Sequence, residues 1–324
     1  MKAALVKQYG VPDDIVVEDV ASPQPGDKEV KLRLRACGVN FPDVLMVAGK
    51  YQMQPPMPFS PGAEMAGDVI EVGSAVKGID VGMRMLCMVG FGGMAEEIVV
   101  PAKALVPIPD GMDYKTAAAV MLTYGTSYHA LKQRAQLQPG ETLLVLGAAG
   151  GVGLAACELG AKMGATVIAA ASTTDKLELA KAHGATQTIN YTEVDLKTTI
   201  KEMTGGKGVD VIYDPVGGEM FDACLRSLAW RGRLLVIGFA SGEIPKAPAN
   251  LPLLKGSSIV GVFWGSFTQH EPQAHMENMA ELVAGFADGS LQPHIGHVFS
   301  LDDAAAAMNV LASRQAMGKV VIEI

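Results

Sequence analysis

A glycine-rich segment between two apolar runs has the residue types and spacing to bind a phosphate-containing ligand. The apolar run Thr142–Leu146 leads into Gly-Ala-Ala-Gly-Gly-Val-Gly at positions 147–153. A helix-forming run to Met163 and a second apolar run, Thr166–Ala171, follow. Glycines permit a tight turn and let the backbone approach a pyrophosphate, whose charge sits at the N-terminus of the next helix. The order strand, glycine loop, helix and strand therefore predicts a dinucleotide-binding βαβ unit, with an ordinary strand-to-helix turn as the alternative.

The residues after the second apolar run indicate which dinucleotide binds. An NAD-preferring site usually ends this strand with Asp or Glu, which holds the ribose 2′-hydroxyl. Here the strand runs into Ser172, two threonines, Asp175 and Lys176, so no carboxylate stands at its end. Hydroxyls and a lysine suit a 2′-phosphate, and this favours NADPH as the cofactor. Two alternatives stay open: Asp175 could reach a ribose hydroxyl, and Lys176 could be a solvated lysine.

Composition excludes several classes of protein. The 324 residues are 49% hydrophobic and 19% charged, which indicates a globular chain long enough for two domains. A net charge of -8 without basic clusters argues against nucleic acid, and the uncharged runs are too short to span a membrane. Residues 1–7 predict a strand rather than a signal peptide. A cytoplasmic location with free thiols is expected from four widely spaced cysteines, Cys37, Cys87, Cys157 and Cys224.

The pattern of the chain changes near residue 115. Before it, short strands punctuated by Gly and Pro predict a compact, irregular β-barrel. After it, alternating strands and helices predict an α/β fold with a doubly wound parallel sheet of the Rossmann type. We expect residues 1–124 to form a substrate domain and residues 125–265 a dinucleotide-binding domain. Residues 266–324 are expected to return and complete the first domain.

Four motifs together carry a resemblance to a known family. They are Ala36–Asp43, Pro61–Gly73, Gly140–Gly153 and Asp214–Gly218. With them, essentially the whole chain resembles the medium-chain dehydrogenase/reductase superfamily, and most of all its zinc-free branch of quinone oxidoreductases and zeta-crystallins. The resemblance implies a GroES-like fold for the β-barrel domain.

The positions of the zinc ligands are the most informative ones for distinguishing members of this superfamily. Relatives that use zinc place a Cys and a His where this chain has Asn40 and Ala63, although Glu64 remains. A catalytic zinc with three protein ligands cannot be built from these residues, and the lobe with four close cysteines is missing. His294 and His297 are separated by Gly296, and we do not expect them to bind a metal. Without a Lewis acid, reduction of an electron-poor acceptor is favoured over alcohol oxidation.

The resemblance also supplies candidate catalytic residues. Asn40 is expected to hydrogen-bond an acceptor oxygen or the nicotinamide ribose, and a turn-forming role is the alternative. Tyr51 is expected to orient or protonate a quinone oxygen, and a packing role is the alternative. Tyr124 is expected to pack in the core, and Glu158 departs from the glutamine usual in the family.

The expected cofactor contacts come from three sources: the glycine loop, positions that match the family, and the loops after later strands. These loops are included because ligands of such sheets bind at the carboxyl ends of the strands. They are Asn40, Thr126, Ala149, Gly150, Gly151, Val152, Ser172, Lys176, Tyr191, Val216, Gly238, Phe239, Phe263, Trp264, Gly265 and Lys319.

The function expected from these features is hydride transfer from NADPH to a quinone or similar conjugated carbonyl, with no metal. Two alternatives remain: a 2-enoyl or alkenal reductase, for which an enoyl thioester is one candidate substrate, and a non-catalytic NADPH-binding protein. The resemblance implies a homodimer in which the apolar strand at 258–263 pairs with its copy across a two-fold axis. In a monomer this strand would be an exposed sheet edge.

Overall fold

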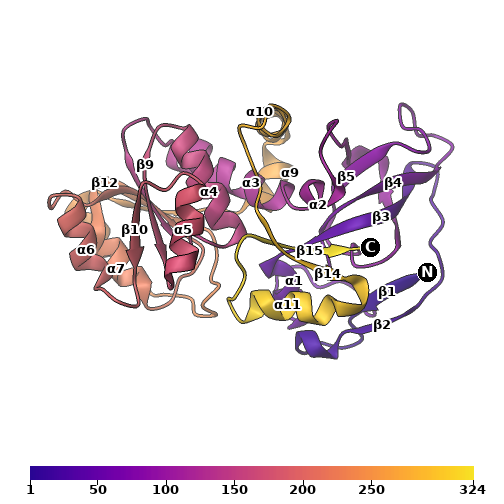
Figure 1. Ribbon diagram of the computed structural model, residues 1–324, viewed down its shortest axis with the longest axis horizontal. Helices are drawn as coiled ribbons and strands as arrows, with labels where there is room; N and C mark the ends of the chain where they lie inside the picture. The colour runs from indigo at the N-terminus through magenta and orange to yellow at the C-terminus, as the bar shows by residue number, and fades with distance from the viewer. The chain divides into compact units, whose positions relative to one another are not determined.

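The computed structural model describes residues 1–324, which form two compact units (Figure 1). Unit 1 consists of Met1–Leu122 and Gln292–Ile324, and unit 2 consists of Thr123–Leu291. Unit 1 is therefore discontinuous in the sequence, whereas unit 2 is a single stretch of chain.

Unit 1 is mainly β-structure with short helices. Its strands are β1 (Lys2–Leu5), β2 (Val16–Asp19), β3 (Glu29–Val39), β4 (Glu64–Val72), β5 (Arg84–Met88), β6 (Glu97–Pro101), β7 (Leu105–Pro107), β14 (Ile295–Ser300) and β15 (Lys319–Glu323). Its helices are η1 (Pro12–Asp14), α1 (Phe41–Val47), η2 (Ala102–Ala104), α2 (Tyr114–Ala117), η4 (Leu301–Asp303) and α11 (Ala304–Ala312). The main sheet has the order β14-β15-β3-β4-β5-β7, and β6 pairs with the first half of β3.

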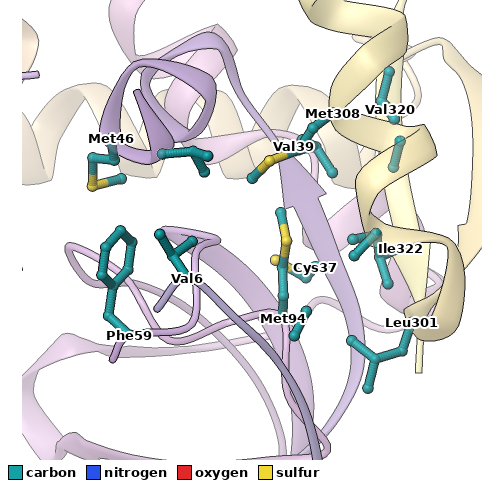
Figure 2. Close-up of a cluster of buried hydrophobic side chains, with 14 residues drawn as sticks. Val6, Cys37, Val39, Met46, Phe59, Met94, Leu301, Met308, Val320 and Ile322 are labelled. Atoms are coloured by element: carbon teal, nitrogen blue, oxygen red, sulfur yellow. The ribbon is translucent and has the colours of Figure 1, made fainter. Parts of the chain in front are cut away.

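The core of unit 1 joins residues that lie far apart in the sequence. Strand β3 contributes Cys37 and Val39, and the late strand β15 contributes Val320 and Ile322 (Figure 2). The α11 residue Met308 packs into the same cluster. The antiparallel pairing of β15 with β3 brings these residues together, with Val320 opposite Val39 and Ile322 opposite Cys37. Burial of this apolar surface holds the late segment of the chain in unit 1.

Unit 2 alternates strands and helices. Its strands are β8 (Thr142–Leu146), β9 (Thr166–Ala171), β10 (Gln187–Asn190), β11 (Val209–Asp214), β12 (Leu228–Val236) and β13 (Ser258–Gly261). Its helices are α3 (Met121–His129, which begins two residues before the unit), the π-helical η3 (Ala130–Ala135), α4 (Gly151–Lys162), α5 (Thr174–Ala182), α6 (Leu196–Met203), α7 (Met220–Ser227), α8 (Asn250–Lys255), α9 (Trp264–His270) and α10 (Pro272–Ala287).

The sheet of unit 2 is entirely parallel and has the order β10-β9-β8-β11-β12-β13. Numbered from the first strand of the unit, this is the order 3-2-1-4-5-6 of a doubly wound dinucleotide-binding fold. Right-handed crossovers place α4 and α5 on one face and the helices α6 and α7, which pack against each other, on the other. The predicted fold class, a Rossmann sheet together with an irregular β-domain, is confirmed.

Residues 266–291 lie elsewhere than the sequence predicted. They were expected to return to the first domain, but they belong to unit 2. The physical reason is the packing of α10 on α3 and η3. Asn278 exchanges two hydrogen bonds with Gln133, at 2.9 and 3.1 Å, and the ring of Phe286 meets Tyr124 edge to face at 4.9 Å. The return to unit 1 begins only at Gln292.

Other differences are local. Residues 114–135 form α2, α3 and the π-helical η3 in succession rather than one continuous helix. The structure also contains α8, α9 and β7, which the sequence pattern did not predict. No helix of the chain combines the length and the apolar composition needed to cross a bilayer.

Candidate functional site

The N-terminus of α4 is the most clearly built anion-binding feature of unit 2. Gly150 is its N-cap residue and has no side chain to cap it, and the first intrahelical bond runs from the Leu154 N–H to the Gly150 carbonyl at 2.9 Å. The N–H groups of residues 151–153 are therefore without partners inside the helix. A Cβ on Gly150 would meet only the Gly147 carbonyl, at 3.4 Å. A phosphate can approach this backbone closely.

Gly153 holds α4 tightly against the turn that precedes it. A Cβ at this position would lie 2.3 Å from the Gly147 carbonyl oxygen, a separation that forces the backbone to shift. Gly147 itself has φ of 55°, a left-handed conformation that suits glycine. The glycines at 147, 150 and 153 thus serve the turn, the open approach and the close packing that a pyrophosphate loop requires.

The loop after β11 lies next to the glycine turn, at the point where the strand order reverses. A Cβ on Gly147 would be 3.2 Å from Cγ2 of Val216. Buried Asp214 shapes this loop, because its Oδ1 accepts the N–H groups of Val216 and Gly217 at 2.9 and 2.8 Å. Burial raises the pKa of Asp214, although these two N–H groups oppose the shift. The predicted contact Val216 therefore lies at the switch point, where ligands of such sheets bind.

The ends of β9 and β10 bring together Ser172, Lys176 and Tyr191, three of the predicted cofactor contacts. Ser172 follows β9, and its carbonyl accepts the Thr192 hydroxyl at 3.3 Å. The Tyr191 N–H donates to the Ala171 carbonyl at 3.3 Å, so Tyr191 lies beside the end of β9. Lys176 lies in the first turn of α5, where its N–H donates to the N-cap Thr173. No carboxylate occupies the end of β9, and Asp175 is exposed on α5.

The loops after β12 and β13 lie at the same edge of the sheet, but their aromatic side chains differ in exposure. Gly238 and Phe239 follow β12, and the Ala240 N–H donates to the Pro215 carbonyl at 3.0 Å, which ties this loop to the loop after β11. Phe263, just after β13, is 56% exposed. Trp264 is buried, and a Cβ on Gly125 would meet its ring at 2.7 Å. The indole of Trp264 therefore packs on α3, and Phe263 is the more accessible of the two aromatics; Gly265 follows within α9.

Helix α3 carries the predicted contact Thr126, the expected core residue Tyr124, and Ser127, which no sequence pattern indicated. Thr126 is half-buried on α3. Tyr124 is buried, as expected, and its hydroxyl donates to Glu158 at 2.5 Å. Burial and the charge of Glu158 raise the pKa of Tyr124 well above its ordinary value, which disfavours it as a proton donor. Ser127 and Tyr213 form a buried hydroxyl pair for which the sequence held no signal.

A buried polar network in unit 1 contains Asn40, Glu64 and Lys319. The Lys319 ammonium donates to Asn40 Oδ1 at 2.6 Å and to Glu64 Oε2 at 3.1 Å. Asn40 Nδ2 donates to the same Glu64 oxygen at 3.1 Å and to the Gly38 carbonyl at 3.3 Å. Glu64 Oε1 accepts the Leu122 N–H at 3.1 Å. The hydrogen-bonding capacity left to the Asn40 amide is therefore that of an acceptor, at Oδ1.

Asp43 and Tyr51 lie close to this network. The two carboxylate oxygens of Asp43 accept the N–H groups of Asn40 and Gly62, at 2.7 and 3.2 Å. Burial raises the pKa of Asp43 to about 6. Tyr51 is half-buried and packs against the core of unit 1. Burial, and then the charge of Asp43, raise the pKa of its phenol, so Tyr51 stays protonated near neutral pH.

The donor set of this network does not fit a catalytic zinc ion. Zinc of that kind takes three Cys, His or carboxylate ligands. Ala63 has no donor atom, the Asn40 amide is a poor ligand, and the Glu64 carboxylate is already paired with the Lys319 ammonium. The Lys319 ammonium thus supplies the positive charge at this place.

An open pyrophosphate loop on a 3-2-1-4-5-6 sheet, with a separate β-domain and no zinc donors, defines a dinucleotide-binding oxidoreductase of the zinc-free type. Comparisons with known proteins identify the same two-part dehydrogenase organisation. Residues 26–110 match the alcohol dehydrogenase GroES-like domain, and residues 151–284 match the zinc-binding dehydrogenase family.

Whole-length relatives narrow the family further. The quinone oxidoreductase-like protein 2 homolog of Nematostella vectensis is 43% identical over 324 residues, which cover 99% of this chain and 88% of that protein. A mycobacterial protein solved with NADPH has a TM-score of 0.93 and 32% identity, with 100% of both chains covered. Escherichia coli quinone oxidoreductase complexed with NADPH has a TM-score of 0.93 and 29% identity, also with 100% of both chains covered. The chain belongs to the quinone oxidoreductase branch of the medium-chain dehydrogenase/reductase superfamily, and the predicted recognition is confirmed.

Proposed function

We propose that this protein is an NADPH-dependent reductase that transfers a hydride to a quinone or a similar conjugated carbonyl acceptor. The open N-terminus of α4 beside the cluster of Ser172, Lys176 and Tyr191 carries the proposal. Two structural relatives are complexes with NADPH, which supports this cofactor and confirms the predicted class of NADP-dependent reductase.

The residues of unit 2 would hold the cofactor in distinct ways. The first turn of α4 would bind the pyrophosphate through backbone N–H groups, without a charged side chain. Ser172 and Lys176 would donate to the 2′-phosphate from the ends of β9 and α5. When bound, NADPH supplies the hydride from C4 of its reduced nicotinamide ring.

The network in unit 1 supports a conjugated acceptor. Because the zinc donors are replaced by an internal ion pair, the chain has no metal Lewis acid to activate a simple alcohol or ketone. A conjugated acceptor spreads the incoming charge over its own double bonds and needs less activation. We propose Tyr51 as the group that meets the acceptor oxygen, because this residue is only partly buried and its phenol stays protonated near neutral pH. The Asn40 amide would then accept a hydrogen bond through Oδ1.

The proposal is tested by steady-state oxidation of NADPH and of NADH with three acceptors in parallel. Benzoquinone, a 2-alkenal and an enoyl thioester present the same hydride chemistry with different acceptor atoms. Turnover with benzoquinone and a clear preference for NADPH are expected. Turnover of the alkenal or thioester alone would move the assignment to an enoyl or alkenal reductase. Binding of NADPH without turnover of any acceptor would favour a non-catalytic role, and equal use of NADH would contradict the 2′-phosphate site.

We also propose that two copies of the chain pair through β13. This strand is the last in the sheet of unit 2, so its outer edge is unpaired, and its residue Ile259 is 37% exposed. The preceding helix α8 exposes Leu253 and Leu254, at 80% and 70%. An open apolar edge of this kind favours strand-to-strand association. Light scattering should give about twice the chain mass of 33.9 kDa, and the substitution Ile259→Lys should lower it to one chain.

A cytoplasmic location remains a proposal. It is supported by the four cysteines, all of which are buried and unpaired. Such thiols persist in a reducing compartment. Fractionation of cells that produce the protein would test the location directly.

A further inference from the structure

Two buried hydroxyl groups of unit 2 form a chain that ends on the first turn of α4. Ser127 on α3 and Tyr213 on β11 are both 0% exposed, and their hydroxyl oxygens are 2.9 Å apart. Ser127 Oγ also lies 3.0 Å from the carbonyl oxygen of Val152, the second residue of α4. Apolar side chains of similar size would fill this space without burying polar groups, so the hydroxyls need an explanation.

The direction of each hydrogen bond in this chain is fixed by chemistry. A carbonyl oxygen only accepts, so the Ser127 hydroxyl donates to Val152. Ser127 has no second proton, and Tyr213 must therefore donate to Ser127. Burial raises the pKa of Tyr213 above its ordinary value, which keeps its phenol protonated as this chain of donors requires.

The chain ends on a peptide group that also faces the glycine loop. The Val152 carbonyl and the Gly153 N–H belong to the same peptide unit, and that N–H is one of those without a partner inside α4. A hydrogen bond to the carbonyl polarises the peptide and makes its N–H a stronger donor. It also fixes the orientation of the peptide plane before any ligand binds.

We propose that Ser127 and Tyr213 are positioning residues for the pyrophosphate of the dinucleotide, acting through the Val152–Gly153 peptide. The inference rests on the proposed function, since it assumes that the α4 N-terminus binds NADPH. These two fully buried side chains would then increase the affinity for the dinucleotide, in addition to packing in the core.

The test compares two ligands on the variants Ser127→Ala and Tyr213→Phe. NADPH carries the pyrophosphate, whereas adenosine 2′-monophosphate carries only the 2′-phosphate end. Loss of one neutral hydrogen bond in the chain should weaken NADPH binding about three- to tenfold, as measured by calorimetry. Binding of adenosine 2′-monophosphate should stay within about twofold of the wild type. A general loss of structure would instead weaken both ligands.

A matched control and a double variant separate positioning from packing. Ser227→Ala removes another buried serine hydroxyl that donates to a helix carbonyl, that of Ala223 at 2.7 Å, and it should leave NADPH binding unchanged. Because the hydroxyls act in series, Tyr213→Phe should have no further effect on NADPH affinity once Ser127 is alanine. Additive effects, or variants that bind like Ser227→Ala, would overturn the inference.

The two proposals fail in different ways. A wild-type protein that does not bind NADPH would overturn the proposed function and, with it, this inference. A wild-type protein that binds NADPH while Ser127→Ala and Tyr213→Phe bind it equally well would overturn the inference alone. Should Ser127→Ala fail to fold, Tyr213→Phe keeps the test, because it removes a single buried oxygen.

Discussion

Replacing Lys319 by methionine should destabilise unit 1 selectively. The ammonium is 3.1 Å from the Glu64 carboxylate, and the two side chains are 5% and 0% exposed. Methionine keeps most of the volume of lysine but leaves the carboxylate buried without its cation. Removing one partner of such a pair costs about 3–5 kcal/mol. With a urea dependence of about 2 kcal/mol per molar, the unfolding midpoint of unit 1 should fall by about 1.5–2.5 M.

The cysteines provide a reporter for each unit. Cys87 belongs to unit 1 and Cys157 to unit 2, and both are buried, so each thiol reacts with an alkylating agent only when its unit opens. Labelling across a urea series, read by peptide mass spectrometry, gives the two midpoints separately. The midpoint at Cys87 should fall in Lys319→Met while the midpoint at Cys157 stays unchanged.

A double variant distinguishes an unpaired charge from poor packing. Glu64→Gln combined with Lys319→Met removes both charges from the buried site, so much of the lost stability should return. If the double variant is as unstable as Lys319→Met, the loss comes from packing. If neither variant moves the Cys87 midpoint, the Lys319 ammonium does not stabilise unit 1 by neutralising the buried Glu64 carboxylate.

Three further predictions concern the cofactor loop, the choice of cofactor and pH. Gly153→Ala should abolish measurable NADPH binding, because its Cβ would lie 2.3 Å from the Gly147 carbonyl; calorimetry on a variant with unchanged circular dichroism checks this. Lys176→Ala should weaken NADPH about tenfold by loss of a charge-assisted hydrogen bond and leave NADH unchanged, and equal losses in competition binding would contradict it. Asp43 has a pKa raised from 3.8 to about 6, so its protonated form is favoured in the folded state and unit 1 should gain stability as the pH falls from 7 towards 5. The Cys87 midpoint should show this gain in the wild type and not in Asp43→Asn, and a gain of equal size in both would refute the assignment.

The sequence predicted the cofactor end of the site well because the signals there are local. The strands Thr142–Leu146 and Thr166–Ala171 have the bounds that the apolar runs indicated. Each signal lies within a stretch of consecutive residues, where strand propensity, glycine geometry and the start of a helix all agree. The order of the remaining strands followed from the regular alternation of strands and helices.

The rest of the site depends on contacts that a local pattern cannot contain. Lys319 and Glu64 lie 255 positions apart, and no periodicity indicates that they meet. Residues 266–291 were predicted in the wrong part of the fold because α10 is held by single side chains, such as Asn278, that look like any polar surface residue. Nothing in the sequence around Trp264 indicated that its ring packs against Gly125, which lies far earlier in the chain.

The discontinuity of unit 1 has a consequence for the order in which the protein is made. Synthesis on the ribosome completes the whole of unit 2, residues 123–291, before β14 and β15 exist. Nascent domains fold as they emerge, so the nucleotide-binding half can mature first. Until β15 is added, β3 lacks one neighbour, and Glu64 has no ammonium beside it. The earliest part of the chain is therefore among the last to become stable, and a nascent chain stalled before Lys319 would expose that part to proteases and chaperones.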